Sequence, residues 1–241
     1  MLIKVLCFCV VPRGTAVSDL SIYRMVCFAA LLCLIVNTAR AEVVSGSARI
    51  LDGDTISLGS TVIRLHGIDA PENGQNCSRA SGKKYNCGSS AENKLKDLIT
   101  TEVTCTGSSR DSYNRLIAIC SSGNKEINRE MVLSGWSLAY RKFSNDYIAE
   151  EDQAKSAKRG VWAGKFELPW EFRANRWGDA AENAPDSECP IKGNINSKGV
   201  RIYHAPWSRS YSRTRINNAK GERWFCTEAE ALAAGWRASL R

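Results

Sequence analysis

The sequence has no apolar run long enough to cross a bilayer. Its longest such run, residues 25–36, has about twelve residues, whereas a spanning helix needs roughly 20. This excludes a polytopic membrane protein. The 241 residues are 44% hydrophobic and 24% charged, which also excludes a disordered chain or a collagen-like fibre. The composition therefore indicates one or two globular domains, and the formal net charge of +8 suits an anionic partner.

The sequence also lacks the spacings that are typical of a zinc site. None of the six cysteines after residue 41 has CxxC spacing, and the two histidines, His66 and His204, are isolated from each other. Neither histidine is expected to be a metal ligand or a catalytic base.

The short apolar run has the features of a secretory signal peptide. Arg24 precedes it, and the small residues Ala39 and Ala41 stand three and one positions before Glu42. We therefore predict a signal peptide over residues 1–41 and a periplasmic or secreted protein with no stable membrane insertion after cleavage. A buried N-terminal helix is the alternative, and the sequence leaves open whether Met1 or Met25 is the start.

Ten cysteines are present, and four of them precede residue 41. Six cysteines remain after the predicted signal peptide, and an even number in an exported chain indicates disulfides. Six cysteines allow fifteen pairings, and their local placement favours pairing in sequence order. The first pair brackets a polar loop, the second flanks two β-like runs, and the third stands alone in the tail. The predicted pairs are Cys77 with Cys87, Cys105 with Cys120, and Cys189 with Cys226.

Short β-like runs and helical stretches alternate along the first 160 residues. The β-like runs cover residues 43–51, 54–58, 61–67, 102–106 and 116–121, and the helical stretches cover 89–100, 127–134 and 148–158. Ser89 and Glu92 have capping-box spacing at the first helix start. The sequence thus predicts an α+β fold, a small five-stranded barrel with about three helices.

After this region the pattern changes. Residues 173–188 carry no periodicity and predict a linker, so the domain itself is expected over residues 43–172. Residues 189–241 form a second, basic unit that is too small for a strong core without its disulfide.

Acidic residues and an arginine gather around two of the predicted strands. Asp54 lies at the start of one predicted strand and Asp69 just past the end of the next, so a hairpin would bring both carboxylates together. Between them, Ile63 and Leu65 point to one side of a strand and Arg64 to the other. Two carboxylates, a backbone carbonyl and waters suit a hard cation such as Ca²⁺. The alternative is that these Asp and Gly residues only form turns.

Two further elements extend this cluster. Pro71 stiffens the turn that would present the Ala70 carbonyl and Glu72. The polar turn at residues 111–115 ends in Arg115, whose planar guanidinium matches phosphate oxygens. Taken alone, Arg115 also fits a solvated surface arginine.

Three motifs together resemble the staphylococcal nuclease (thermonuclease) family. They are DGDT at residues 52–55, RLHGIDAPE at 64–72 and DSYNR at 111–115, and the resemblance extends from Ser45 to Trp162. It implies an OB-fold barrel and a Ca²⁺-dependent phosphodiesterase.

The resemblance also implies a role for each matching residue. Asp54 and Asp69 would be carboxylate ligands of Ca²⁺, and Ala70 would lend its backbone carbonyl. Glu72 would be the general base, and Arg64 and Arg115 the phosphate-binding arginines. In addition, Tyr113 would pack against the nucleotide and Asp52 would be a supporting acid.

The resulting prediction is an exported, Ca²⁺-dependent endonuclease, monomeric, with DNA and/or RNA as its substrate. The tail resembles a small C-terminal module of some exported nucleases. Its basic character suggests that it holds nucleic acid, and the alternative is an appendage that only stabilises the fold. One alternative is a non-catalytic OB-fold protein of the cell envelope that binds nucleic acid or polysaccharide. A structural envelope protein is the other.

Overall fold

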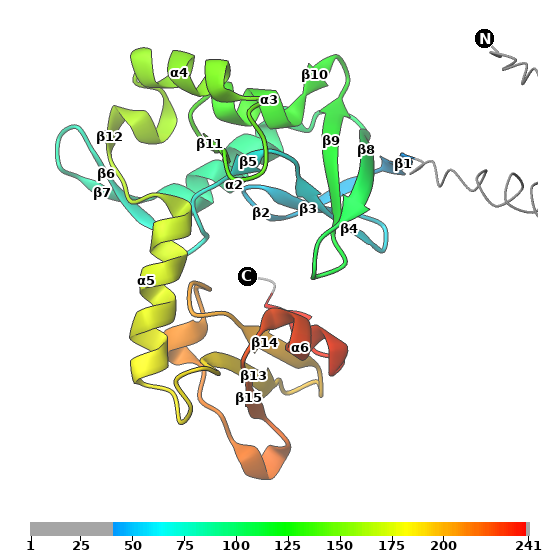
Figure 1. The fold of residues 1–241 in the computed structure, drawn as a ribbon, viewed down its shortest axis with the longest axis vertical. Helices are drawn as coiled ribbons and strands as arrows, with labels where there is room; N and C mark the ends of the chain where they lie inside the picture. Colours follow the sequence, from blue (N-terminus) through cyan, green and yellow to red (C-terminus); the bar gives the residue numbers. More distant parts are fainter. Residues whose placement is uncertain (1–40, 240–241) are drawn as a thin grey trace, which may run out of the picture. The chain divides into compact units, whose positions relative to one another are not determined.

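A curled sheet of seven short strands is the largest sheet in the part of the chain that the structure describes (Figure 1). The strands run in the order β1-β8-β9-β4-β3-β2, with β10 on β9, and all neighbours are antiparallel except β4 and β9. Their bounds are β1 Glu42–Gly46, β2 Ala48–Asp52, β3 Thr55–Leu58, β4 Thr61–Leu65, β8 Val103–Arg110, β9 Leu116–Ser122 and β10 Lys125–Glu126. The mixed α+β architecture confirms the predicted OB-fold class.

The computed structural model describes residues 41–239, which belong to one compact unit, Arg40–Arg241. All but the last residue of the predicted signal peptide lies outside the described residues. Within residues 41–239, no helix has the length and apolar character that a bilayer crossing requires. We call residues 41–168 the barrel region and residues 189–239 the C-terminal module.

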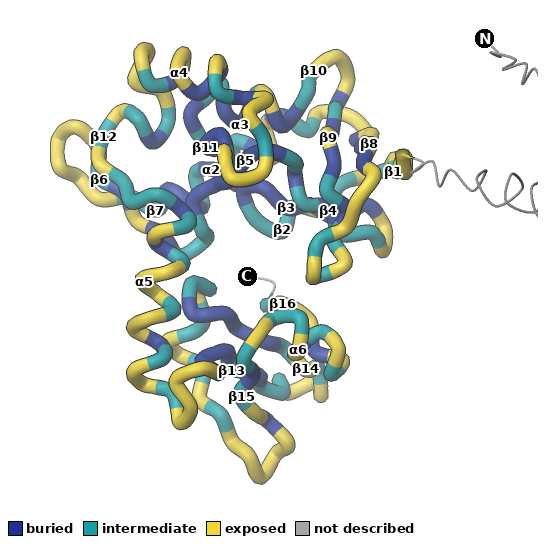
Figure 2. The backbone as a smooth tube through the Cα atoms, in the orientation of Figure 1, coloured by how far each residue is buried: buried dark blue, intermediate teal, exposed yellow. Residues whose placement is uncertain are grey.

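Alternation along β4 sets which side chains enter the core of the barrel region. Ile63 and Leu65 are buried, whereas Arg64 between them is only partly buried and faces away from the core, as predicted. Figure 2 shows the buried positions concentrated in the sheet and in the helices that cover it. These helices are α2 Cys87–Leu98, α3 Ile127–Leu133 and α4 Ile148–Ser156.

Helix α2 begins earlier than its sequence pattern predicts. Its N-cap is Asn86, whose side-chain oxygen accepts a hydrogen bond from the Ser89 backbone N–H (2.7 Å). The predicted cap at Ser89 is therefore wrong. Glu92, the predicted partner in the capping box, instead accepts a hydrogen bond from Asn73 Nδ2 (2.7 Å).

Short strand pairs surround the main sheet. β5 (Ile68–Asp69) pairs with β11 (Leu138–Ala139), and β6 (Asn76–Arg79) pairs with both β7 (Lys84–Asn86) and β12 (Gly164–Lys165). A 3₁₀ helix, η2 (Gly160–Ala163), leads into β12.

The three predicted disulfides are all present. Cys77–Cys87 joins β6 to the start of α2, and Cys105–Cys120 joins two residues that face each other across β8 and β9. Cys189–Cys226 lies within the C-terminal module.

The predicted linker is helical over most of its length. Helix α5 covers Pro169–Glu182, so the irregular structure expected for residues 173–182 is wrong. Leu168 precedes Pro169 with extended backbone angles, and proline at the first helical position fixes the helix start. The segment that follows, residues 183–188, is neither helix nor strand.

The C-terminal module is a four-stranded sheet with one short helix. The strand order is β15-β13-β14-β16. A small core, to which Trp177 of α5 adds its ring, contains Ile191, Tyr203, Phe225, Ala231 and Trp236. The bounds are β13 Ile191–Ile195, β14 Arg201–His204, β15 Arg223–Phe225, β16 Arg237–Ala238 and α6 Glu228–Ala233, with 3₁₀ helices η3 Tyr211–Arg213 and η4 Asn218–Lys220.

Candidate active site

The DGDT turn connects β2 to β3 and brings its acids against the start of α2. The Asp54 N–H donates to Asp52 Oδ1 (3.0 Å), which closes the turn. A Cβ on Gly53 would lie 2.8 Å from the Ala70 Cβ and 2.9 Å from the Ala91 Cβ. Only glycine allows this close approach, so the turn can pack directly against the segment that carries Asp69.

Asp54 and Asp69 lie together, as the hairpin interpretation predicts. The Ala70 N–H donates to Asp54 Oδ2 (2.8 Å), which ties the end of β5 to the DGDT turn. Asp69 is fully buried at the end of β5. A backbone hydrogen bond therefore holds the Asp54 carboxylate in place, and strand β5 carries the buried Asp69 beside it.

Arg64 bridges these two carboxylates from β4. Its Nη1 forms an ion pair with Asp54 Oδ1, and its Nη2 donates to Asp69 Oδ1 (2.8 Å). Both carboxylates draw the guanidinium to this side of the strand, opposite the apolar core.

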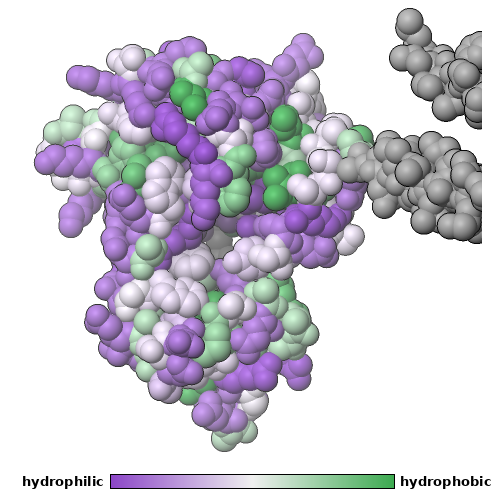
Figure 3. Space-filling model, in the orientation of Figure 1, coloured by the Kyte–Doolittle hydropathy of each residue, from purple (hydrophilic) through white to green (hydrophobic). Residues whose placement is uncertain are grey.

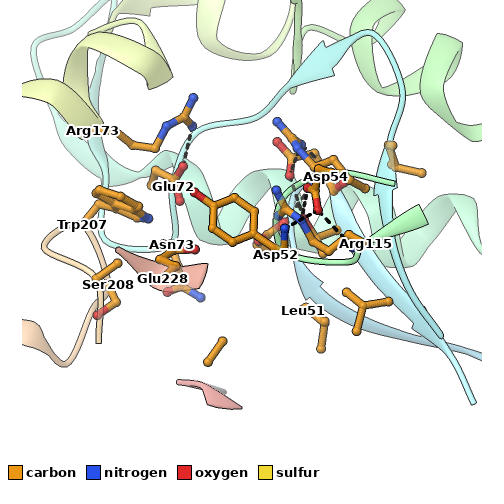
Figure 4. A pocket seen from close by; sticks show the side chains of 18 of the residues that line it. Leu51, Asp52, Asp54, Glu72, Asn73, Arg115, Arg173, Trp207, Ser208 and Glu228 are labelled. Atoms are coloured by element: carbon orange, nitrogen blue, oxygen red, sulfur yellow. Dashed lines mark hydrogen bonds and ion pairs between the residues drawn. The ribbon is translucent and has the colours of Figure 1, made fainter. Parts of the chain in front are cut away.

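Arg173 is a second arginine in this cluster, where it contacts Asp69 and Glu72, and no sequence pattern predicted it. From the second turn of α5, its Nη2 donates to Asp69 Oδ2 (2.8 Å) and its Nη1 donates to Glu72 Oε1 (2.6 Å). Figure 4 shows Arg173 reaching Glu72. The proline at the helix start and the apolar positions Phe172, Trp177 and Ala180 are the signals that could have indicated α5, but none of them points to this contact.

The backbone around Glu72 is held in place by several contacts. The Glu72 N–H donates to Gln75 Oε1 (3.1 Å), and Gln75 Nε2 donates to the Glu167 carbonyl (2.7 Å) just before α5. A Cβ on Gly88 would lie 1.8 Å from the Glu72 carbonyl oxygen, so the start of α2 packs directly on this segment. The position of Glu72 is thus coupled to both α2 and α5.

Arg115 and Tyr113 lie on the turn between β8 and β9. Arg115 Nε donates to Asp111 Oδ2 (2.7 Å), and the Arg115 guanidinium lies 5.0 Å from the centre of the Tyr113 ring. Asp111 Oδ1 accepts the backbone N–H groups of both residues, which shapes the turn. The turn lines the same cleft as Asp54 and Glu72, and Asp111 is the carboxylate that Arg115 contacts there.

Burial and neighbouring charges shift the pKa values of the acids in the cluster. Burial is the largest cause that raises the pKa of Glu72 to about 7; the charges of Asp54 and Asp69 add to this shift, and Arg173 offsets only part of it. Burial and the charges of Asp54 and Glu72 raise the pKa of Asp52 well above its usual range. Burial would also raise the pKa of Asp54, but Arg64 and the hydrogen bonds from Asp52 and the Ala70 N–H outweigh it and lower that pKa.

The chemistry of this donor set suits a divalent cation. Four carboxylates interact here with two guanidinium groups, and the raised pKa of Asp52 and Glu72 reflects burial together with uncompensated negative charge. Oxygen ligands of this kind are those that Ca²⁺ prefers. Within residues 41–239, however, no three acidic, histidine or cysteine side chains converge as a ready metal site. Arg64 and Arg173 contact the oxygens that such a cation needs.

Comparison with known proteins identifies the family. The sequence model described as "Staphylococcal nuclease homologue" matches residues 62–164. The chain is 33% identical to the micrococcal nuclease of Shigella flexneri over 164 residues, which cover 60% of this chain and 83% of that protein. The OB-fold barrel and these matches define a nuclease-type domain. The chain belongs to the staphylococcal nuclease family.

Other relatives differ in name and in length. The chain is 28% identical to the "Succinoglycan biosynthesis protein ExoI" of Rhizobium meliloti over 170 residues, 68% of this chain and 88% of that protein. It is 27% identical to the "Endonuclease YhcR" of Bacillus subtilis over 212 residues, 78% of this chain but only 16% of that protein. Several relatives are thus named as nucleases, which supports a nuclease function.

The family match also separates the site residues into two groups. Arg64, Asp69, Glu72 and Arg115 lie inside residues 62–164, whereas Asp54 precedes that range. Arg173 and the whole C-terminal module follow it.

Proposed function

We propose that the protein is an exported, Ca²⁺-dependent nuclease that hydrolyses phosphodiester bonds in DNA and/or RNA. The observation that carries this proposal is the cluster of Asp54, Asp69 and Glu72 around Arg64 in one cleft. Three disulfides suit an oxidising compartment, periplasmic or extracellular. We propose a monomer as the working form.

Each residue of the cluster has a place in this reaction. Asp54, Asp69 and the Ala70 carbonyl would hold Ca²⁺, with Asp52 supporting Asp54 through its hydrogen bond. When bound, the ion would supply positive charge next to the phosphate. Glu72 would accept the proton of the attacking water as general base, a role that suits a carboxylate with a pKa of about 7.

The arginines act on the phosphate itself. Arg64 and Arg115 would donate hydrogen bonds to the non-bridging oxygens, where negative charge grows in the transition state. Both are paired with carboxylates before substrate binds, so each exchanges a carboxylate oxygen for a phosphate oxygen. Tyr113, beside Arg115, would pack against the nucleotide ring.

A digestion assay tests this proposal. The full chain, purified in its oxidised form, would be incubated with single-stranded DNA, duplex DNA or RNA in Ca²⁺, Mg²⁺ or chelator. We expect Ca²⁺-dependent cleavage, and a loss of roughly 10²–10³-fold in rate for Arg64→Ala, since one preorganised electrostatic donor is removed. Glu72→Gln should lose activity as well.

Arg129→Ala is the matched control. Arg129 is an exposed residue of α3 that pairs with Glu126 and Glu150 and lies outside the cleft lining. This variant should keep the wild-type rate. A folded wild-type protein that binds nucleic acid but never cleaves it would overturn the proposal and favour a non-catalytic binding barrel.

A further inference from the structure

The cleft that holds the candidate active site has a second wall outside the barrel region. Its volume is about 1140 Å³. One side carries Asp54, Arg64 and Glu72, and the other is formed by α5 and the C-terminal module. Figure 3 shows a hollow on this face between the two regions. A substrate bound at the carboxylates therefore lies against residues that the barrel alone would not supply.

Trp207 and Tyr203 are aromatic side chains of the module on this wall, and Tyr203 is buried in the core. Trp207 follows β14, is half-buried, and lines the cleft with Ser208. Figure 4 shows its ring on the side of the cleft that also carries Ser208 and Glu228. The Trp207 ring lies 6.3 Å from that of Trp177 on α5, at an angle of 32°. Trp177 thus supports one part of the ring, and the half-buried ring leaves surface for a ligand.

The backbone of this loop is fixed close to the catalytic segment. A Cβ on Gly74 would lie 3.2 Å from the Trp207 carbonyl oxygen and 3.8 Å from the Arg209 Cα. Gly74 is two residues after Glu72, so Trp207 is held at a short distance from the candidate general base. The Ser208 N–H donates to the Ala205 carbonyl (2.8 Å) and closes the turn that presents the ring.

The charges on this wall favour a polyanion. Arg209 and Arg237 are exposed and line the cleft, and Glu228 is the acid that the module adds beside them. An aromatic ring next to exposed cations is the combination by which proteins bind single-stranded nucleic acid, with a base on the ring and phosphates on the cations. In a duplex each base is stacked between its neighbours and is not available to the ring.

We propose that Trp207 forms a base-binding subsite, in which it stacks on an unpaired base next to the phosphate bound at Arg64. The C-terminal module thereby makes the enzyme selective for single-stranded substrate. This inference rests on the proposed nuclease function and adds a subsite that the barrel region does not contain.

Binding measured without cleavage tests the subsite. Fluorescence anisotropy of a labelled oligothymidylate and of a labelled duplex would be recorded with the full chain in chelator, over a series of salt concentrations. We expect Trp207→Ala to weaken single-strand binding about 5- to 150-fold, the range for loss of one stacked base. Duplex binding should change little, and the salt dependence should stay as in the wild type because no charge is removed.

Three further variants make the result specific. Trp224→Ala removes a half-buried tryptophan of β15 that is not part of the cleft lining, and it should keep wild-type affinity. Arg209→Ala should instead lower the slope of log affinity against log salt by about 0.7, the value for one phosphate contact on a single strand. Trp207→Phe keeps an aromatic face and should retain much of the single-strand affinity, which makes it the test of stacking if Trp207→Ala perturbs folding.

The outcomes separate this inference from the proposed function. Wild-type affinity in Trp207→Ala, or a wild-type protein that binds no single strand in chelator, would overturn the subsite even if the enzyme cleaves. Single-strand binding that depends on Trp207, in a protein that never cleaves with Ca²⁺, would support the subsite and overturn the nuclease.

Discussion

The barrel region and the C-terminal module depend on different sources of stability. The barrel region buries a core cluster of nineteen residues, whereas the module buries five and borrows Trp177 from α5. The larger core lets the barrel region keep buried carboxylates that destabilise it, because apolar burial elsewhere offsets their cost. The smaller core leaves the module dependent on its disulfide and on α5. Chemistry is thus concentrated where the fold can tolerate it.

Removing one disulfide from each region should give the largest contrast. Cys189→Ala with Cys226→Ala opens a loop with a sequence separation of 37, which should lower the stability of the module by about 4 kcal/mol through chain entropy. A core of five residues is too small to keep the module folded after that loss of stability. Limited proteolysis should therefore cut the module while the barrel region stays resistant.

Cys105→Ala with Cys120→Ala is the matched pair in the barrel region. Its sequence separation is 15, so the expected loss is about 3 kcal/mol, spread over the larger core. The barrel region should remain folded with a lower melting temperature. Equal proteolysis of both regions in either variant would show that they unfold as one unit.

A smaller effect should come from the buried acids of the barrel region. The pKa of Glu72 is about 7 in the folded protein and about 4.5 when unfolded, so the folded state retains a proton that the unfolded state releases. The free energy of unfolding should fall as pH rises from about 4.5 to 7, by up to about 3 kcal/mol for this group. Urea titrations in chelator over this window would measure the slope.

Glu72→Gln should flatten that pH dependence, because the amide carries no charge at any pH. Glu171→Gln, at an exposed position of α5, is the control and should follow the wild-type curve. A slope that is the same in Glu72→Gln and in the wild type would mean that Glu72 does not destabilise the fold.

The smallest effect should come from the helix that connects the two regions. Arg173 contacts Asp69 and Glu72, and a guanidinium there competes with a metal ion for the same oxygens. Arg173→Gln should therefore tighten Ca²⁺ binding about tenfold, or roughly 1.4 kcal/mol, as measured by calorimetry without nucleic acid. Arg176→Gln is the control, since Arg176 lies over the Phe172 ring on the same helix. Unchanged affinity in Arg173→Gln would show that the two cations do not compete.

The parts of the site that could be predicted from the sequence are those close together in it. Alternation along β4 predicts Arg64 opposite Ile63 and Leu65, and the DGDT spacing predicts that Asp54 approaches Asp69. These contacts join residues within about 20 positions, where strand and turn geometry limit the possible arrangements.

Contacts between residues far apart in the chain cannot be predicted from strand and turn geometry. Arg173 is 101 residues from Glu72, and no local pattern links them. Its helix also has an exposed polar face of Asn175 and Arg176, which resembles a linker in composition. The spacing of Ser89 and Glu92 predicts a capping box, but the side chain that accepts the Ser89 N–H belongs to Asn86, three residues earlier.

The positions of the disulfides have one further consequence. Each of the three bonds in residues 41–239 closes a loop within one region, and none of them joins the barrel region to the C-terminal module. The exposed segment at residues 183–188 is therefore the covalent tether that follows α5. A single cut there would leave Arg173 attached to the barrel region and the module held only by noncovalent contacts, such as that of Trp177 with its core. The second wall of the cleft would then depend on those contacts alone.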